Sequence, residues 1–179
     1  MINMNKKSAN IDLSSITIEE ANRENLYEIK ICAHEFLDFI NDFKERFLEK
    51  NLIVFTVNYK KLLVGVIVAE DKSYKVNSLE RMLPIMYIHL IYINPSFREK
   101  GIGNLLLDHF LQTEKDKGIA SVFAKIPKKY VKGIKFYLRN DFHVISRKKN
   151  KIILKKELWN NFGLKKCFLI GTSLNDIFT

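Results

Sequence analysis

The stretch LIYINPSFREKGIGNLLLDHF, residues 90–110, decides how this chain is organised. It contains the end of an apolar run, a break at Pro95, two glycines and the start of an amphipathic helical pattern. A helix that begins after such a loop leaves several backbone N–H groups unpaired at the positive end of its dipole. Gly101 and Gly103 carry no Cβ and tolerate positive φ angles, so an anion such as phosphate can approach this backbone closely.

The loop alone does not decide between a phosphate site and an ordinary turn. It lacks the GK[ST] sequence of a Walker A loop and the GxGxxG pattern of a dinucleotide-binding turn. Arg98 and Lys100 could add positive charge at its rim. A glycine-containing loop before a helix is more often only a turn, so the surrounding elements have to carry the interpretation.

A strand and a helix are expected on the two sides of the loop. The residues PIMYIHLIYI, 84–93, are almost all apolar, which predicts a central strand that is covered on both faces and ended by Pro95. After the loop, apolar residues recur at helical spacing and Gly118 is placed to end the helix. The shared face of this helix comprises Leu106, Leu107, Phe110 and Leu111.

The rest of the chain predicts further strands and helices. We expect strands over 16–21 and 120–126, hairpins over 52–71 and 142–158, a helix or helix pair over 22–50 and a short helix over 130–140. Residues 73–83 indicate a looser connection. One buried helical face is predicted from Leu26, Ile29, Ala33, Phe36, Ile40, Phe43 and Phe47. This order predicts an α/β fold with a mixed sheet.

The length and the cysteines limit the class of protein. The 179 residues suffice for one domain over 15–158, with a flexible leader over 1–14 and a tail over 159–179 that packs on the domain or on a partner subunit. Cys32 and Cys167 are far apart and show no metal-ligand spacing, so we expect neither a disulfide nor a metal. Since the sequence shows no secretory leader or membrane-length apolar run, we expect a soluble cytoplasmic protein.

The formal net charge of +10 suits a polyanionic partner. Nucleic acid, an anionic surface and a phosphate-bearing cofactor are all compatible with it. The lysines are scattered except in RKKNKIILKK, residues 147–156, and no known nucleic-acid-binding pattern accompanies them. We therefore favour a solvated surface over a nucleic-acid interface.

Two motifs resemble those of the GCN5-related N-acetyltransferase (GNAT) family. The family's loop is R/Q-x-x-G-x-G/A after a strand that ends in V-x-P, and here Ile93-Asn94-Pro95 precedes Arg98-x-x-Gly101-x-Gly103. The stretch GIKFYLRNDFHVIS, residues 133–146, is similar to the second motif, A-x-x-F-Y-x-x-x-G-F. The element order also matches, over residues 16–158. Three residues depart from the pattern of the second helix and its turn: Tyr130, Gly133 and Asp141.

The resemblance implies an acyl-CoA N-acyltransferase fold, with a mixed, mostly antiparallel central sheet flanked by helices. It also implies transfer of an acetyl group from acetyl-CoA to a primary amine by direct attack in a ternary complex, without a metal. The pantetheine arm would pair with strand 86–93 where this strand splays from strand 120–126. The implied cofactor-binding residues are Ile91, Tyr92, Ile93, Arg98, Glu99, Lys100, Gly101, Ile102, Gly103 and Asn104.

His89 and Tyr137 are the candidate catalytic residues. His89 is the one readily titrating side chain of the apolar strand, and simple alternation would place it beside Tyr87 and on the side of Ile91. It could accept the proton of the amine, or it could be a buried histidine while water serves as the base. Tyr137 follows Phe136, where the family usually has its tyrosine, and could protonate the leaving sulfur or simply be a core residue.

The amine acceptor and the oligomeric state cannot be derived from the sequence. Glu35, Asp38 and Asp42 could present carboxylates to a cationic amine, but we favour a solvated helix face opposite the apolar stripe as their explanation. A homodimer is compatible with the apolar tail. We expect no catalytic role for the remaining histidines and the cysteines, namely His34, His109, His143, Cys32 and Cys167.

Two other classes of function stay open at this level. A catalytically silent member of the fold could bind acyl-CoA as a sensor or partner module, and it would not need His89 or Tyr137. A basic protein could instead bind nucleic acid through residues 147–156.

Overall fold

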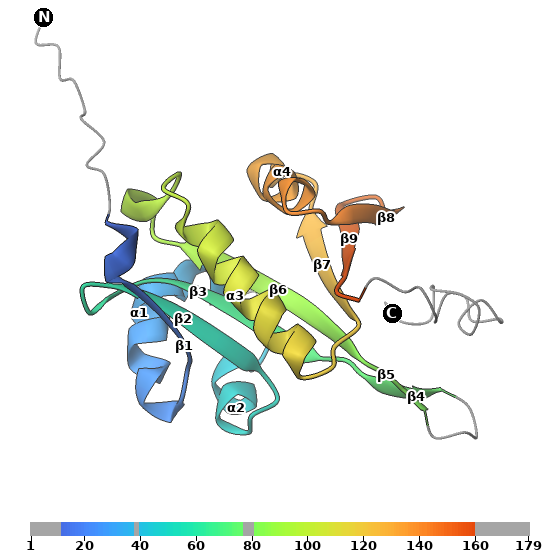
Figure 1. The fold of residues 1–179 in the computed structure, drawn as a ribbon, viewed down its shortest axis with the longest axis horizontal. Coiled ribbons are helices and arrows are strands. Elements are labelled where there is room, and N and C mark those ends of the chain that lie inside the picture. The colour runs from blue at the N-terminus through green and yellow to red at the C-terminus, as the bar shows by residue number, and fades with distance from the viewer. Residues whose placement is uncertain (1–11, 38–39, 77–80, 160–179) are drawn as a thin grey trace, which may run out of the picture.

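The computed structural model describes residues 12–37, 40–76 and 81–159 (Figure 1). Most of the predicted leader and nearly all of the predicted tail lie outside these residues. The helices are α1 (Leu26–Leu37), α2 (Phe43–Leu48), α3 (Ile102–Asp116) and α4 (Val131–Arg139), with short 3-10 turns at Leu13–Ser15, Arg23–Asn25 and Pro95–Phe97. The strands are β1 (Ile16–Glu20), β2 (Ile53–Tyr59), β3 (Leu62–Asp71), β4 (Tyr74–Val76), β5 (Arg81–Leu83), β6 (Ile85–Ile93), β7 (Ser121–Pro127), β8 (His143–Arg147) and β9 (Lys151–Glu157).

The main sheet has seven strands in the order β1-β2-β3-β6-β7-β9-β8. Its neighbours are antiparallel except for β6 and β7, which are parallel and are joined through α3. Helices α3 and α4 pack on one face, and α1 and α2 pack on the other (Figure 1). The predicted α/β fold with a mixed, mostly antiparallel sheet is confirmed.

The predicted helical stretch over 22–50 is a helix pair. Of its apolar face, Leu26 and Phe36 are partly buried, and the other five residues are 6 % exposed or less: Ile29, Ala33, Ile40, Phe43 and Phe47. These five form one cluster with Val54, Val66 and Val68 of the sheet. The periodicity of three and four therefore identified the face that anchors α1 and α2 on the sheet.

The expected loose connection over 73–83 is wrong in part. Residues 74–76 and 81–83 pair antiparallel as the ribbon β4-β5, separate from the main sheet. Each of these strands has only three residues, which is too short for period-2 alternation to be recognised in a sequence.

A β-bulge interrupts β6 at His89. Ile88 pairs with Ala69 and Leu90 pairs with Val68, so His89 has no partner in the ladder with β3. A bulged residue reverses the alternation of side chains along its strand. The side chains of β6 after His89 therefore lie on the face opposite to the one that simple alternation predicts.

This reversal corrects one expectation from the sequence. Ile91 and Ile93 pack in the cluster that contains α3, whereas Leu90 and Tyr92 pack in the cluster of α1 and α2. His89 stays with Tyr87, at a ring-centroid distance of 4.9 Å. The bulge thus separates the histidine, on the α1–α2 side of the sheet, from Ile91 and Ile93 on the α3 side.

The parallel ladder between β6 and β7 is short. It joins Ile85–Ile88 to residues 121–124, and its last pair is Ile88 with Ala124. The predicted divergence of these two strands is therefore present, and it begins at His89 on one side and Lys125 on the other. Because β6 has no neighbour on this edge beyond Ile88, the side chains of its second half are only half-buried, although they pack against the clusters on both faces of the sheet.

Candidate active site

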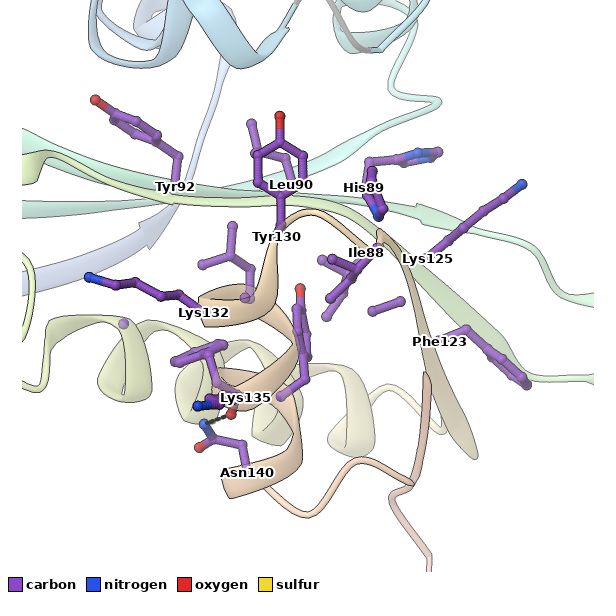
Figure 2. A pocket seen from close by; sticks show the side chains of 18 of the residues that line it. Ile88, His89, Leu90, Tyr92, Phe123, Lys125, Tyr130, Lys132, Lys135 and Asn140 are labelled. Atoms are coloured by element: carbon purple, nitrogen blue, oxygen red, sulfur yellow. Dashed lines mark hydrogen bonds between the residues drawn. The ribbon is translucent and has the colours of Figure 1, made fainter. Parts of the chain in front are cut away.

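A single groove of about 2200 Å³ passes through the opening between β6 and β7. On the α3–α4 side it is lined by the loop before α3 and by much of α4. On the α1–α2 side it is lined by Arg46, Glu70, Lys72, Tyr87 and His89. Figure 2 shows the groove, with β6, β7 and α4 around it. The two faces of the sheet are thus connected at the point where the ladder ends.

The first turn of α3 presents unpaired backbone donors. The N–H groups of Gly101, Ile102 and Gly103 donate to no acceptor in the described part of the chain, whereas those of Asn104 and Leu105 return to the carbonyl of Gly101. Gly101 has φ of +84°, and an added Cβ would meet nothing within 4 Å there. Free donors, open space and the helix dipole together fit an anion of the size of a phosphate.

The side chains of this loop contact the protein, in contrast to its free backbone N–H groups. The Arg98 Nε donates to the carbonyl of Ile93 at 2.7 Å, so Arg98 braces the end of β6 against the loop. The Lys100 ammonium lies over the ring of Phe97, and the Ile102 side chain is 1 % exposed in the core. Among the predicted cofactor-binding residues, Lys100 and Ile102 do not line the groove; the other eight do.

On the α3 side of the groove, hydrogen bonds of the Asn140 side chain connect α4 with α3. The Asn140 Nδ2 donates to the carbonyl of Phe136 at 2.9 Å and to the Asn104 Oδ1 at 3.2 Å. Lys132 and Lys135 of α4 also line the groove (Figure 2). Their position at the groove was not predicted, because scattered lysines on a short helix cannot be told from a solvated face.

On the other side of the sheet, His89 belongs to a cluster of charged groups. Its Nε2 lies 2.8 Å from the Glu70 Oε2. The same carboxylate binds Arg46 at 2.8 Å and Lys72 at 2.6 Å. The sequence did not point to Glu70, because its position opposite Tyr87 depends on the strand register around the bulge.

These contacts set the ionisation of the cluster. Burial disfavours the charged form of Glu70, but hydrogen bonds from Lys72, His89 and Arg46 outweigh it and hold the pKa of this carboxyl below its usual value. Burial lowers the pKa of His89 below its usual value, against the opposing effect of Glu70. The ionised carboxylate can only accept, so the His89 Nε2 donates to it and Nδ1 is left as the basic nitrogen.

Tyr137 lies on the opposite wall, on α4. It is 6 % exposed and its ring contacts those of Phe136 and Phe142. Burial, and secondarily Tyr87, raises the pKa of its hydroxyl. Within the described residues, every fully buried polar side-chain atom has a hydrogen-bond partner. The Tyr137 hydroxyl has no such partner there, so its oxygen is not fully buried. Because Tyr137 lines the groove, we infer that this oxygen opens onto it.

Of the three acidic residues considered as amine receptors, the structure describes the side chain of Asp42 alone, and this one does not line the groove. Asp42 precedes α2, is exposed, and lines a separate pocket with His34. Asp38 and the side chain of Glu35 lie outside what the structure describes. No group of His, Cys, Asp or Glu side chains within the described ranges could hold a metal ion.

The structure places all three residues that depart from the expected second motif and explains the departure at Asp141. Asp141 adopts φ of +63° and so makes the turn for which the family uses glycine. At Gly133 an added Cβ would meet only atoms 3.9 Å away. Tyr130 precedes α4 and lines the groove (Figure 2).

None of the helices in residues 12–37, 40–76 and 81–159 is long and apolar enough to cross a membrane.

Solved structures with the same fold were found. A PaiA N-acetyltransferase from Thermoplasma acidophilum, in complex with coenzyme A, superposes with a TM-score of 0.64 at 19% identity, over 80% of this chain and 99% of that one. The ribosomal-protein-S18-alanine N-acetyltransferase from Escherichia coli gives 0.65 at 14%, over 83% and 98%. Arabidopsis thaliana NAA60 in complex with acetyl-CoA gives 0.67 at 11%, over 79% and 98%.

The family itself is identified by sequence. A search of the curated proteins gives no match. The family model described as "Acetyltransferase (GNAT) domain" matches residues 50–144, which run from the start of the first hairpin to β8 and include the loop before α3. This match covers more than half of the chain, which therefore belongs to the GNAT acetyltransferase family.

Proposed function

We propose that this protein transfers the acetyl group of acetyl-CoA to a primary amine, by direct attack of the amine within a ternary complex. The observation that carries the proposal is the continuity of the groove. It leads from the free N–H groups at the start of α3, through the opening between β6 and β7, to His89 on the far face of the sheet. Donor and acceptor could thus approach one another from opposite faces.

The α3 side of the groove suits the nucleotide end of acetyl-CoA. The N–H groups of Gly101, Ile102 and Gly103 would bind the diphosphate, and Lys132 and Lys135 would add positive charge along the same wall. Beyond Ile88, the edge of β6 no longer pairs with β7 and would accept an extended arm. When bound, acetyl-CoA supplies the thioester whose acetyl group is transferred.

His89 would serve as the general base. Its pKa is lowered, so the neutral form predominates at physiological pH. Glu70 fixes the tautomer by accepting from Nε2, and Nδ1 can then take a proton from the attacking amine, directly or through a water. Its side chain is 22% exposed, which is enough for a small acceptor or a water to reach it.

Tyr137 would serve as the general acid. Its hydroxyl opens onto the groove and its raised pKa keeps it protonated at neutral pH. The departing thiolate of coenzyme A needs a proton, and a positioned hydroxyl can give one. The base and the acid would then come from opposite sides of the same opening.

The test is release of free thiol from acetyl-CoA, followed across a panel of primary amines, with mass spectrometry of the product. We expect thiol release that depends on the amine and an acetylated amine in equal amount. Binding of acetyl-CoA without turnover of any amine would contradict the transferase and favour a binding module.

A further inference from the structure

A pair of lysines lies at the opening of the groove, on the face opposite α4. Lys125 is the first residue of β7 beyond the last ladder pair, as His89 is on β6. Along β7, Phe123 belongs to the cluster of Tyr87 on the α1–α2 face, so alternation directs Lys125 to that face as well. Figure 2 shows the Lys125 side chain directed away from α4, on the side of His89.

Strand β9 supplies the second lysine. Lys125 is opposite Ile153, and Lys151 lies two residues further along the same strand, opposite Pro127. Residues two apart on a strand share a face, so Lys151 is the diagonal neighbour of Lys125. Ile153 packs in the cluster of Tyr87 and Phe123, which confirms the face. Both lysines line the groove and both are half-buried.

The two ammonium groups have no carboxylate partner among residues 12–37, 40–76 and 81–159. The carboxylate of Glu70, which lines the same groove, is already bound by Arg46, Lys72 and His89. The Lys151 ammonium, together with burial and Lys148, lowers the pKa of Lys125 to about 8. An anion bound between the two ammonium groups would offset their mutual repulsion.

We propose that Lys125 and Lys151 form an anion-binding subsite on the acceptor side of the groove, and that the acceptor is a small primary amine that also carries a carboxylate or a phosphate. This inference rests on the proposed function, because it concerns the acceptor of that reaction. Since His89 and Lys125 follow the same ladder pair on neighbouring strands, the amine and the anionic group must fit within one small molecule. Polyamines and cationic peptides meet an unfavourable potential there.

The subsite is distinct from the proposed diphosphate site. The free N–H groups of Gly101, Ile102 and Gly103 start α3, which packs on the opposite face of the sheet. An acceptor held by the lysine pair would therefore approach without displacing the nucleotide. Loss of either lysine should affect the choice of amine, not the affinity for acetyl-CoA.

The experiment compares matched amines with the full chain at saturating acetyl-CoA. Tyrosine is paired with tyramine, O-phosphoethanolamine with ethanolamine, and putrescine is the cationic probe; rates are corrected for the fraction of free amine. In at least one pair, we expect kcat/KM to favour the anionic member by about tenfold or more. The pair that shows the preference tells a carboxylate from a phosphate.

Variants connect this preference to the lysines. Lys125→Gln and Lys151→Gln should each reduce the ratio of anionic to neutral amine by about tenfold, while Lys125→Arg retains it. Lys128→Gln is the matched control, since Lys128 is an exposed lysine just after β7 that does not line the groove. A CoA-binding assay and a thermal melt verify that each variant is folded.

Three results would overturn the inference. Preference for putrescine or for the neutral amines would leave the transferase intact but exclude the anionic acceptor. A raised KM for acetyl-CoA in the lysine variants, with an unchanged amine ratio, would assign the pair to the nucleotide. Absence of thiol release with every amine would contradict the proposed function itself, and the inference with it.

Discussion

The Glu70 carboxylate, on β3, hydrogen-bonds His89 at the bulge of β6: the Glu70 Oε2 lies 2.8 Å from the His89 Nε2. The carboxylate is itself fixed by Arg46 and Lys72. This arrangement orients the imidazole and leaves Nδ1 as its basic nitrogen, which makes Glu70 a positioning residue in the proposed reaction.

The first prediction concerns the pH dependence of kcat/KM. Because burial lowers the pKa of His89, the acid limb in the wild type should lie at a lower pH than the titration of an ordinary histidine. Glu70 raises this pKa, so Glu70→Gln should lower it further and move the limb to a more acidic pH. The plateau should fall about tenfold, because the tautomer is no longer fixed. The same amine is used for both proteins, so that its own titration cancels.

A merely structural Glu70 would give a different outcome. The plateau would fall in proportion to the folded fraction, and the midpoint of the acid limb would not move. A limb that shifts to higher pH in Glu70→Gln would contradict the proposed hydrogen bond, and wild-type turnover by His89→Ala would assign the base to water.

The second prediction concerns the acid. Tyr137→Phe keeps the ring contacts with Phe136 and Phe142 and removes only the hydroxyl. We expect kcat to fall on the order of 100-fold, with an unchanged dissociation constant for acetyl-CoA and an unchanged thermal midpoint. Stopped-flow measurement of thiol release checks the rate of the chemical step. Wild-type turnover by this variant would remove Tyr137 from the mechanism.

The third prediction concerns the loop before α3. Gly101→Asp adds a negative charge beside the N–H groups of Ile102 and Gly103, and should abolish binding of acetyl-CoA in isothermal titration. Gly118→Asp is the matched control, because Gly118 also has a positive φ, of +94°, and open space around it. Each variant should lose about 1 kcal/mol of folding stability from the left-handed backbone, but only the first should lose the cofactor.

The fourth prediction concerns the strand that leads into the loop. A Cβ at Gly65 of β3 would lie 2.5 Å from the Ile93 Cδ1 and 2.7 Å from the Tyr92 carbonyl oxygen. Gly65→Ala should therefore lower the free energy of unfolding by about 2 kcal/mol and weaken binding of acetyl-CoA, because β6 must move. Urea unfolding measures the first effect and titration the second.

Gly133→Ala provides the opposite case. The nearest atoms to an added Cβ are 3.9 Å away, and the residue lies inside α4. The substitution should stabilise the protein by about 0.5–1 kcal/mol, since alanine is more favourable than glycine inside a helix.

An unchanged free energy of unfolding in Gly65→Ala would show that β3 and β6 are not in tight contact at Gly65.

The sequence was sufficient for the fold and for the loop, because both depend on local patterns. Apolar spacing identified the buried face of α1 and α2, and the break at Pro95 followed by Gly101 and Gly103 located the start of α3. It was not sufficient for the far side of the groove. The bulge at His89 reverses the alternation that a sequence pattern assumes, and it cannot be recognised in a run of apolar residues.

The charged residues around the opening depend on this tertiary geometry. Glu70 meets His89 through the register of β3 with β6, and Lys125 meets Lys151 through the register of β7 with β9. In the sequence, Glu70 and His89 are 19 positions apart. Lys125 and Lys151 cannot be distinguished there from the many other lysines of the chain. Only pairing between strands, which is non-local, brings these side chains together.

A crystal structure with coenzyme A bound tests the central claim most directly. The account predicts the diphosphate on the backbone N–H groups of Gly101, Ile102 and Gly103, and the sulfur in the opening between β6 and β7, near the Tyr137 hydroxyl. A diphosphate bound on the α1–α2 face, or held by Lys125 and Lys151 in place of the α3 loop, would contradict it.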